Sequence, residues 1–292
     1  MSAWLEASHL RVDVGGAPAI DGLSLAAGGD HVLVLGAARA LFGAAAGLRR
    51  VTRGDLLVDG RPAAQAVRAG AAACAPLDPP LPPSWSVLEY ATWSARVAGQ
   101  PRRAARALAG EALARMRLTA AAATRLSAAP PVVRRALGVA AALATGARVL
   151  LVEDPVGGLP DEAAHLLART IARAVEDLRT AVFAGRVALE SPLALAADEA
   201  VVIDGSHVVA QGAPGEIAAG ERTLALRVLG DFEAFARAVD ASGGRAQVSS
   251  GAPPAAHVRV DLGPLAARDL LRIAASSNAV VVELRPIARS FA

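Results

Sequence analysis

Short apolar runs alternate with longer amphipathic stretches along most of this chain. Apolar runs bounded by turn residues are typical of buried strands, and longer amphipathic repeats are typical of helices. Strands that alternate with helices indicate an α/β core built on a parallel sheet. The predicted strands are residues 10–14, 23–25, 31–35, 56–58, 71–76, 149–152, 181–183, 200–203 and 208–210, and the predicted helices start near residue 86 or span 102–118, 131–144 and 161–179.

Two of these helices carry a specific start signal. Ser86 and Glu89 have the spacing of a capping box, in which each side chain accepts a hydrogen bond from the other residue's backbone N–H. Pro130 or Pro131 can occupy the first turn of the following helix, where no backbone N–H is needed.

The pattern changes near residue 220, where we place a domain boundary between residues 1–220 and 221–292. The second part predicts the order strand, helix, strand, strand, helix, strand, which is the βαββαβ order of a ferredoxin-like α+β domain. Its expected elements are residues 224–228, 231–241, 246–249, 257–260, 265–275 and 280–284.

Composition limits the partners and the compartment. Hydrophobic residues make up 54% of the chain. The longest uncharged apolar stretch, residues 136–147, is nevertheless shorter than the roughly 20 residues that span a bilayer. The first residues lack the features of a signal peptide, so we expect a cytoplasmic protein. Net charge is +3 and the arginines are interleaved with Asp and Glu, which argues against a nucleic-acid partner.

Several framing residues follow one another in a recognisable order. The strand 31–35 ends in Gly36 and leads into a segment rich in glycine and alanine. Leu126 and Ser127 precede a helix, and the apolar run 149–152 is followed by Glu153-Asp154-Pro155. Over residues 3 to 217 this order resembles an ATP-binding cassette (ABC) ATPase, a P-loop NTPase-like fold. The resemblance implies a parallel sheet, an antiparallel β subdomain and a helical subdomain near residues 84–147.

The resemblance places the phosphate-binding Walker A loop after Gly36. A working loop reads Gly-x-x-x-x-Gly-Lys-Ser/Thr, and its lysine and hydroxyl hold phosphate and magnesium. Residues 36–48 contain no Lys, Ser or Thr, and the whole chain has no lysine. Aligned from Gly36, Phe42 stands at the lysine position; aligned back from Gly47, the loop is shorter by about four residues. The vestigial loop comprises Gly36, Ala37, Ala38, Arg39, Phe42 and Gly43.

Arg39 has two interpretations. Its guanidinium can bind phosphate, but it is larger than the ammonium that it would replace. Alternatively, it is a solvated surface residue.

Other positions that the resemblance assigns to nucleotide binding are also altered. Val14 stands where an aromatic ring would stack on adenine, and a valine has no π-face. Leu77 replaces a glutamine that senses magnesium, and Arg186 replaces a histidine that contacts the γ-phosphate.

The signature and Walker B segments keep part of the family pattern. Leu126 and Ser127 remain, but Ala-Ala-Pro replaces Gly-Gly-Gln, so Ser127 is either a signature residue or the N-cap of the following helix. The carboxylates occur in reversed order, Glu153 and then Asp154. Asp154 would be a general base one methylene too short.

The segment around residues 81–89 keeps the family frame, which in relatives packs against an intracellular helix of a membrane permease. Trp85, Glu89 and Trp93 would contribute to this docking surface, or the tryptophans would be ordinary core residues. The resemblance therefore predicts a degenerate, bacterial-exporter-type cassette on the inner face of the cell membrane. It would dock on an integral membrane permease and pair with an intact cassette or with itself.

This interpretation expects no cofactor and no metal. One alternative is a weak ATPase that uses Glu153, Asp154 and Arg39 with ATP and magnesium. A second alternative is a scaffold or regulator that reuses the fold. Residues 284–292 resemble the proline-containing end of exporter cassettes that carry an accessory domain.

Overall fold

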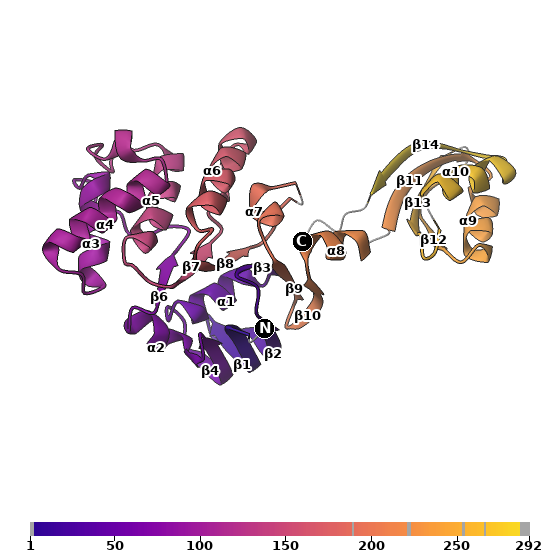
Figure 1. Cartoon of the computed structure of the whole chain (residues 1–292). Helices are drawn as coiled ribbons and strands as arrows, with labels where there is room; N and C mark the ends of the chain where they lie inside the picture. The colour runs from indigo at the N-terminus through magenta and orange to yellow at the C-terminus, as the bar shows by residue number, and fades with distance from the viewer. Residues whose placement is uncertain (1–2, 189, 221–222, 253–254, 266, 287–292) are drawn as a thin grey trace. The chain divides into compact units, whose positions relative to one another are not determined.

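The structure is a computed structural model that describes residues 3–188, 190–220, 223–252, 255–265 and 267–286. It divides into two compact units, Met1–Pro214 and Gly215–Ser290 (Figure 1). The division falls a few residues before the boundary near residue 220 that the sequence predicts. Within the described residues, no helix is both long enough and apolar enough to cross a membrane.

A six-stranded sheet forms the centre of the first unit, in the order β10-β9-β3-β8-β7-β6. All neighbouring strands are parallel except β10, which forms a hairpin with β9. The middle strands are buried along nearly their whole length, as continuous apolar runs in a parallel sheet require. The strands are β3 (His31–Gly36), β6 (Ala72–Ala75), β7 (Val149–Glu153), β8 (Arg179–Ala184), β9 (Glu199–Asp204) and β10 (His207–Gly212).

A second, antiparallel sheet has the order β2-β1-β4-β5 and completes the predicted α/β architecture. Helix α1 (Ala38–Ala45) packs between the two sheets, and all three share one hydrophobic core that includes Trp4, Phe42 and Phe183. The strands are β1 (Leu5–Val14), β2 (Ala17–Ala27), β4 (Val51–Val58) and β5 (Arg61–Pro62), and helix α2 (Ala63–Arg68) follows them.

A helical subdomain lies at one end of this unit, at the left of Figure 1. The capping box at Ser86 and Glu89 is confirmed, and Pro131 occupies the first turn of α5 as predicted. The N-cap of α5 is Pro130, so the prediction that Ser127 caps this helix is wrong. The helices are α3 (Val87–Val97), α4 (Arg102–Arg115), η1 (Thr119–Ala121) and α5 (Pro131–Leu143).

Two further helices complete the first unit: α6 (Asp161–Ala174) and α7 (Pro192–Leu195). Helix α8 (Pro214–Gly220) begins at the last residue of this unit and otherwise belongs to the second unit. Helix α6 ends at Ala174, before the predicted residue 179. Strand β8 already begins at Arg179, and its Thr180 N–H donates a hydrogen bond to the carbonyl of Asp30.

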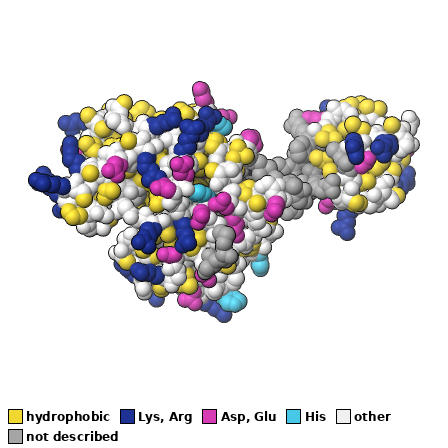
Figure 2. Space-filling model, viewed as in Figure 1, with side chains coloured by type: hydrophobic (Ala, Val, Ile, Leu, Met, Phe, Trp, Pro, Cys, Tyr) yellow, Lys and Arg dark blue, Asp and Glu magenta, His cyan; other side chains and the backbone are white. Residues whose placement is uncertain are grey.

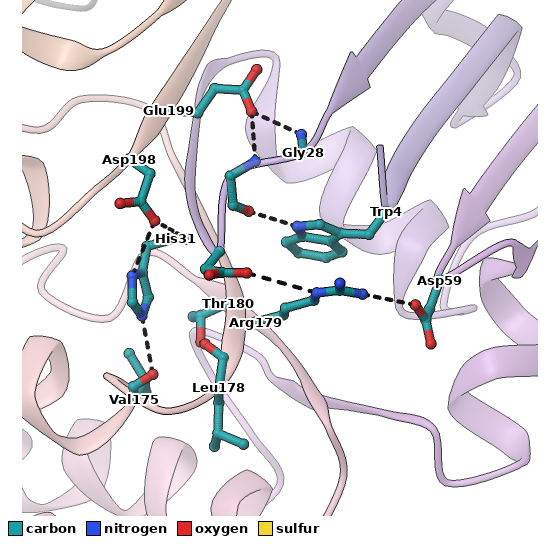
Figure 3. Close-up of polar contacts among 12 residues, drawn as sticks. Trp4, Gly28, His31, Asp59, Val175, Leu178, Arg179, Thr180, Asp198 and Glu199 are labelled. Carbon is teal, nitrogen blue, oxygen red and sulfur yellow. Dashed lines mark hydrogen bonds and ion pairs between the residues drawn. The ribbon is translucent and has the colours of Figure 1, made fainter. Parts of the chain in front are cut away.

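Polar contacts join the start of β3 to β9 and to the antiparallel sheet (Figure 3). The indole N–H of Trp4 donates to the carbonyl of Gly29 at 2.6 Å. The Glu199 carboxylate accepts from the N–H groups of Gly28 and Gly29 and from the Gln211 amide. Burial raises the pKa of Glu199, but the hydrogen bonds from Gln211, Gly29 and Gly28 outweigh it and hold this pKa below its usual value. The turn before β3 is therefore hydrogen-bonded to a charged carboxylate.

Figure 3 also shows His31 and Arg179, whose contacts reach the end of α6 and the antiparallel sheet. The His31 ring lies between the Asp198 carboxylate and the carbonyl of Val175. Arg179 reaches both Asp30 and Asp59, at 3.8 and 3.0 Å. These contacts fix the end of β3 that is opposite to the edge where functional residues are expected.

The second unit is a four-stranded antiparallel sheet in the order β12-β13-β11-β14 with two helices, which confirms the ferredoxin-like order. Phe235 and Val239 of α9 and Leu270 of α10 pack with the buried side of the strands. The elements are β11 (Thr223–Gly230), α9 (Phe232–Ala241), β12 (Arg245–Ala252), β13 (Ala255–Asp261), α10 (Ala267–Ser276) and β14 (Ala279–Pro286). The exporter-like segment 284–292 falls mostly outside the described residues.

Candidate functional site

A cavity of about 360 Å³ opens where β3, β6 and β7 end. These strands are parallel, so their carboxyl ends meet at one edge of the sheet, which is the usual ligand site of open α/β sheets. The cavity brings together the positions predicted for the phosphate loop, the magnesium-sensing glutamine and Walker B. It is lined by Arg39, Phe42, Gly43, Leu48, Arg49, Pro76, Leu77, Asp78 and Glu153.

The connection from β3 to α1 is the most informative feature of this edge. Strand β3 ends at Gly36 and α1 begins at Ala38, so only Ala37 lies between them. The Gly-x-x-x-x-Gly-Lys loop, whose N–H groups surround phosphate, needs several more residues between strand and helix. The structure therefore favours the alignment with a shortened loop. The expectation that Ala38, Arg39, Phe42 and Gly43 form a loop is wrong, because all four belong to α1.

The glycines of this segment have structural roles. Gly36 has a φ of +93°, and a side-chain carbon there would collide with the carbonyl oxygen of Ile203 in the neighbouring strand β9. At Gly43, such a carbon would lie only 2.7 Å from Cδ of Arg49, so this glycine leaves room for the arginine stem. Both glycines are explained by packing within the chain and not by phosphate binding.

Phe42 is a core residue. It is 1% exposed and packs edge-on against Phe183 of β8, with ring centroids 5.7 Å apart. A lysine at this position would place its ammonium in the core beside the antiparallel and parallel sheets. Phe42 therefore does not mark the lysine position of a working loop.

Glu153 is held by contacts within the chain. Its Oε2 accepts the N–H of Leu77 at 3.1 Å, and its Oε1 lies 3.7 Å from Nε of Arg39. The Arg39 side chain is 79% exposed, so this ion pair contributes at most about 1 kcal/mol. A magnesium ion at this place would need the Glu153 carboxylate as a ligand. That carboxylate is instead in contact with the Arg39 guanidinium and the Leu77 N–H.

Arg135 of α5 joins three segments, and the sequence analysis did not single it out. Its guanidinium donates to the carbonyl of Leu77, to the Asp78 carboxylate at 3.2 Å and to the carbonyl of Gly157 at 3.3 Å. Its side chain is only 19% exposed, whereas the neighbouring Arg134 is exposed. Arg135 thereby connects the helical subdomain to the segments that follow β6 and β7.

Asp154 is not among the residues that line the cavity. Its backbone has a φ of +36°, and its carboxylate lies against Gly157. Desolvation raises the pKa of Asp154, and the Arg135 charge and the Gly157 N–H only partly oppose that effect. A half-buried carboxyl that is turned into the following loop is not positioned to activate a water in the cavity.

Solved structures with a similar fold include ATP-binding subunits of ABC transporters. CbiO1 of Clostridium perfringens, part of the transporter complex cbiONQ, has a TM-score of 0.64 and 20% identity and covers 75% of this chain and 92% of its own. The cassette MJ1267 has a TM-score of 0.63 and 14% identity, and covers 74% of this chain and 94% of its own. The chain has the fold of an ATP-binding cassette. No protein-family model and no curated protein matches it.

A cassette fold implies bound ATP and magnesium, and the residues here do not fit them. One residue links β3 to α1, and no lysine or hydroxyl side chain stands at the start of that helix. Magnesium prefers carboxylate, hydroxyl and phosphate oxygens. At the corresponding place of this cassette, Glu153 instead faces the Arg39 guanidinium.

The remaining cassette positions lie apart from the cavity. Ser127 and Arg186 are exposed, Val14 is 36% exposed at the end of β1, and none of them lines the cavity. Leu126 is buried and its N–H donates to the carbonyl of Trp85. Of the predicted site residues, the cavity therefore brings together Arg39, Phe42, Gly43, Leu77 and Glu153.

Proposed function

We propose that this chain is a catalytically degenerate cassette subunit of an ABC export system. It docks on a membrane permease at the cytoplasmic face of the membrane and pairs with an active cassette. The observation that carries the proposal is the single residue between β3 and α1, which leaves no loop to surround a polyphosphate. The retained cassette fold supports a role that depends on shape and contacts.

A pair of unequal cassettes gives this chain a defined place. Cassettes that pair head to tail share each nucleotide between the Walker A segment of one chain and the signature segment of the other. The site built on this chain's own α1 is inactive in our proposal. The site built on the partner's Walker A loop faces the exposed Ser127 and can still turn over.

The weak-ATPase alternative has less support. It requires Glu153 to bind magnesium and Asp154 to act as the base, but Glu153 is paired with Arg39 and Asp154 lies against Gly157. Phosphoryl transfer relies on magnesium and cationic groups that stabilise the transferred phosphate. Arg39 already forms an ion pair with Glu153, at 3.7 Å.

ATP turnover by the purified full-length chain tests this proposal. With ATP and magnesium, we expect phosphate release no faster than in buffer alone, because no described residue at the start of α1 can hold the γ-phosphate in place. An intact cassette assayed in parallel provides the positive control. Magnesium-dependent turnover that disappears in Glu153→Gln would contradict the proposal and support the weak-ATPase alternative.

A further inference from the structure

A second cavity, of about 380 Å³, lies between the end of α1, strand β4 and helix α2. It shares only Leu48 and Arg49 with the cavity at the carboxyl edge of the central sheet. Neither the family resemblance nor the proposed function gives it a role. The lining residues that matter for its chemistry are Leu48, Arg49, Arg50, Asp55, Leu57 and Arg68.

The turn that ends α1 forms one wall of this cavity. Gly47 has a φ of +71°, and the N–H groups of Leu48 and Arg49 both donate to the carbonyl of Gly43, so the chain folds back against the helix. A side-chain carbon at Gly47 would lie 3.2 Å from Cβ of Ala64 in α2. The glycine therefore lets the turn approach α2 closely and brings two helices to one cavity.

Arg49 is held in place within the chain. Its stem crosses α1 where Gly43 leaves room, since a side-chain carbon at Gly43 would lie 2.7 Å from its Cδ. Arg49 is partly buried, whereas Arg50 and Arg68 are exposed. The planar guanidinium matches the oxygens of a phosphate group, and a stem that is already fixed loses less conformational entropy when it binds.

The charge of this cavity is not balanced. Arg49, Arg50 and Arg68 contribute three positive charges, and Asp55 is the one carboxylate among the lining residues. Within the part of the chain that the structure describes, no carboxylate forms an ion pair with any of these three arginines. The cavity at the edge of the central sheet has two arginines and two carboxylates instead. Figure 2 shows basic side chains over the part of the unit where Figure 1 places α1 and α2.

Apolar side chains accompany these arginines. Leu48 is 70% exposed, and Val51, Leu57 and Pro62 also line the cavity. Arginines that meet anionic headgroups, beside an apolar side chain that enters the acyl boundary, are the two contributions that hold a protein on a membrane surface. An inorganic anion would use the arginines but would gain nothing from Leu48.

We propose that this cavity binds the phosphate of an anionic phospholipid headgroup and that Leu48 inserts into the adjacent lipid. The phosphate ester is held by the guanidinium groups of Arg49, Arg50 and Arg68. The inference goes beyond the proposed function, because it gives this chain a direct contact with the bilayer that requires no permease.

Cosedimentation of the purified full-length chain with lipid vesicles tests the inference. One set of vesicles contains phosphatidylcholine alone, and the other also contains phosphatidylglycerol, which carries a net negative charge. We expect about 100-fold tighter binding to the phosphatidylglycerol vesicles, because each of three arginines near the surface contributes about fivefold. Leu48→Ser should weaken this binding by about tenfold, because it removes the apolar contact.

The double variant Arg50→Gln with Arg68→Gln should weaken binding to phosphatidylglycerol vesicles by about 30-fold. Both arginines are exposed, so the fold should be kept, which circular dichroism checks. Arg103→Gln with Arg106→Gln is the matched control, because it removes the same charge from exposed positions of α4 outside this cavity. We expect the control to change binding by less than about twofold.

Three results would overturn the inference. The first is equal binding to the two kinds of vesicle, and the second is an equal loss in the control variant, which would indicate attraction by overall charge. The third comes from titration with inorganic phosphate. Saturable phosphate binding that the Arg50→Gln, Arg68→Gln variant abolishes, without binding to vesicles, would identify a site for a free anion. None of these probes contains a nucleotide, so their outcome is independent of the ATP turnover that tests the proposed function.

Discussion

A lysine in place of Phe42 is expected to destabilise the first unit by about 3–5 kcal/mol and not to create an ATP site. Phe42 is 1% exposed and packs edge-on against Phe183. The substitution removes this ring contact and also forces an ammonium either into the core or out of α1. Since a whole domain is stable by only about 5–15 kcal/mol, the loss is a large share of the total.

Urea unfolding followed by tryptophan fluorescence measures this effect. All three tryptophans, Trp4, Trp85 and Trp93, lie in the first unit, so the signal reports on that unit alone. Phe42→Leu is the matched control and should cost about 1 kcal/mol, because it keeps an apolar side chain of similar size. A Phe42→Lys protein that keeps its stability and gains magnesium-dependent ATP binding would contradict the shortened-loop alignment.

Replacing Arg135 with methionine is expected to lower the free energy of unfolding by about 2–3 kcal/mol. The change leaves the carbonyls of Leu77 and Gly157 and the Asp78 carboxylate without their donor. Hydrogen bonds to a charged group contribute about 1.5–3 kcal/mol, and the partial exposure of Arg135 admits water that recovers some of the loss. The melting temperature should fall by roughly 4–8 °C for a loss of about 2 kcal/mol.

Arg134→Met provides the comparison for this variant, because it changes the adjacent residue in the same way on the exposed side of α5. Its hydrogen bond to the carbonyl of Ser127 is 3.3 Å long and exposed, so the expected change is below about 1 kcal/mol. Similar losses in both variants would show that the contacts of Arg135 do not stabilise the connection between the helical subdomain and the central sheet.

The local parts of this fold could be predicted because each depends on residues that are close in sequence. The capping box at Ser86 and Glu89 and the first turn at Pro131 depend on residues a few positions apart. The continuous apolar run in β7 identified a strand that is buried on both faces of a parallel sheet. The βαββαβ order in the second unit followed from the same patterns.

The chemistry of the site depends on contacts between distant residues, which local patterns do not contain. The sequence left two alignments open after Gly36, and the backbone contact of Gly36 with Ile203 was not part of either. Helix α1 was missed because the resemblance assigned its residues to a phosphate loop, and α6 was extended to residue 179, although the helix ends at Ala174. Arg134 and Arg135 are adjacent and chemically identical, so the sequence alone does not distinguish them. Only the fold shows that Arg135 faces its three hydrogen-bond acceptors.

The start of α1 offers no site for a polyphosphate. Isothermal titration of the purified full-length chain with ATP in the presence of magnesium tests it most directly, with an intact cassette as the positive control. We predict no saturable heat up to millimolar ATP, because Ala37 alone cannot supply the backbone N–H groups that surround phosphate. Saturable, magnesium-dependent binding in the micromolar range by this chain alone would contradict the account.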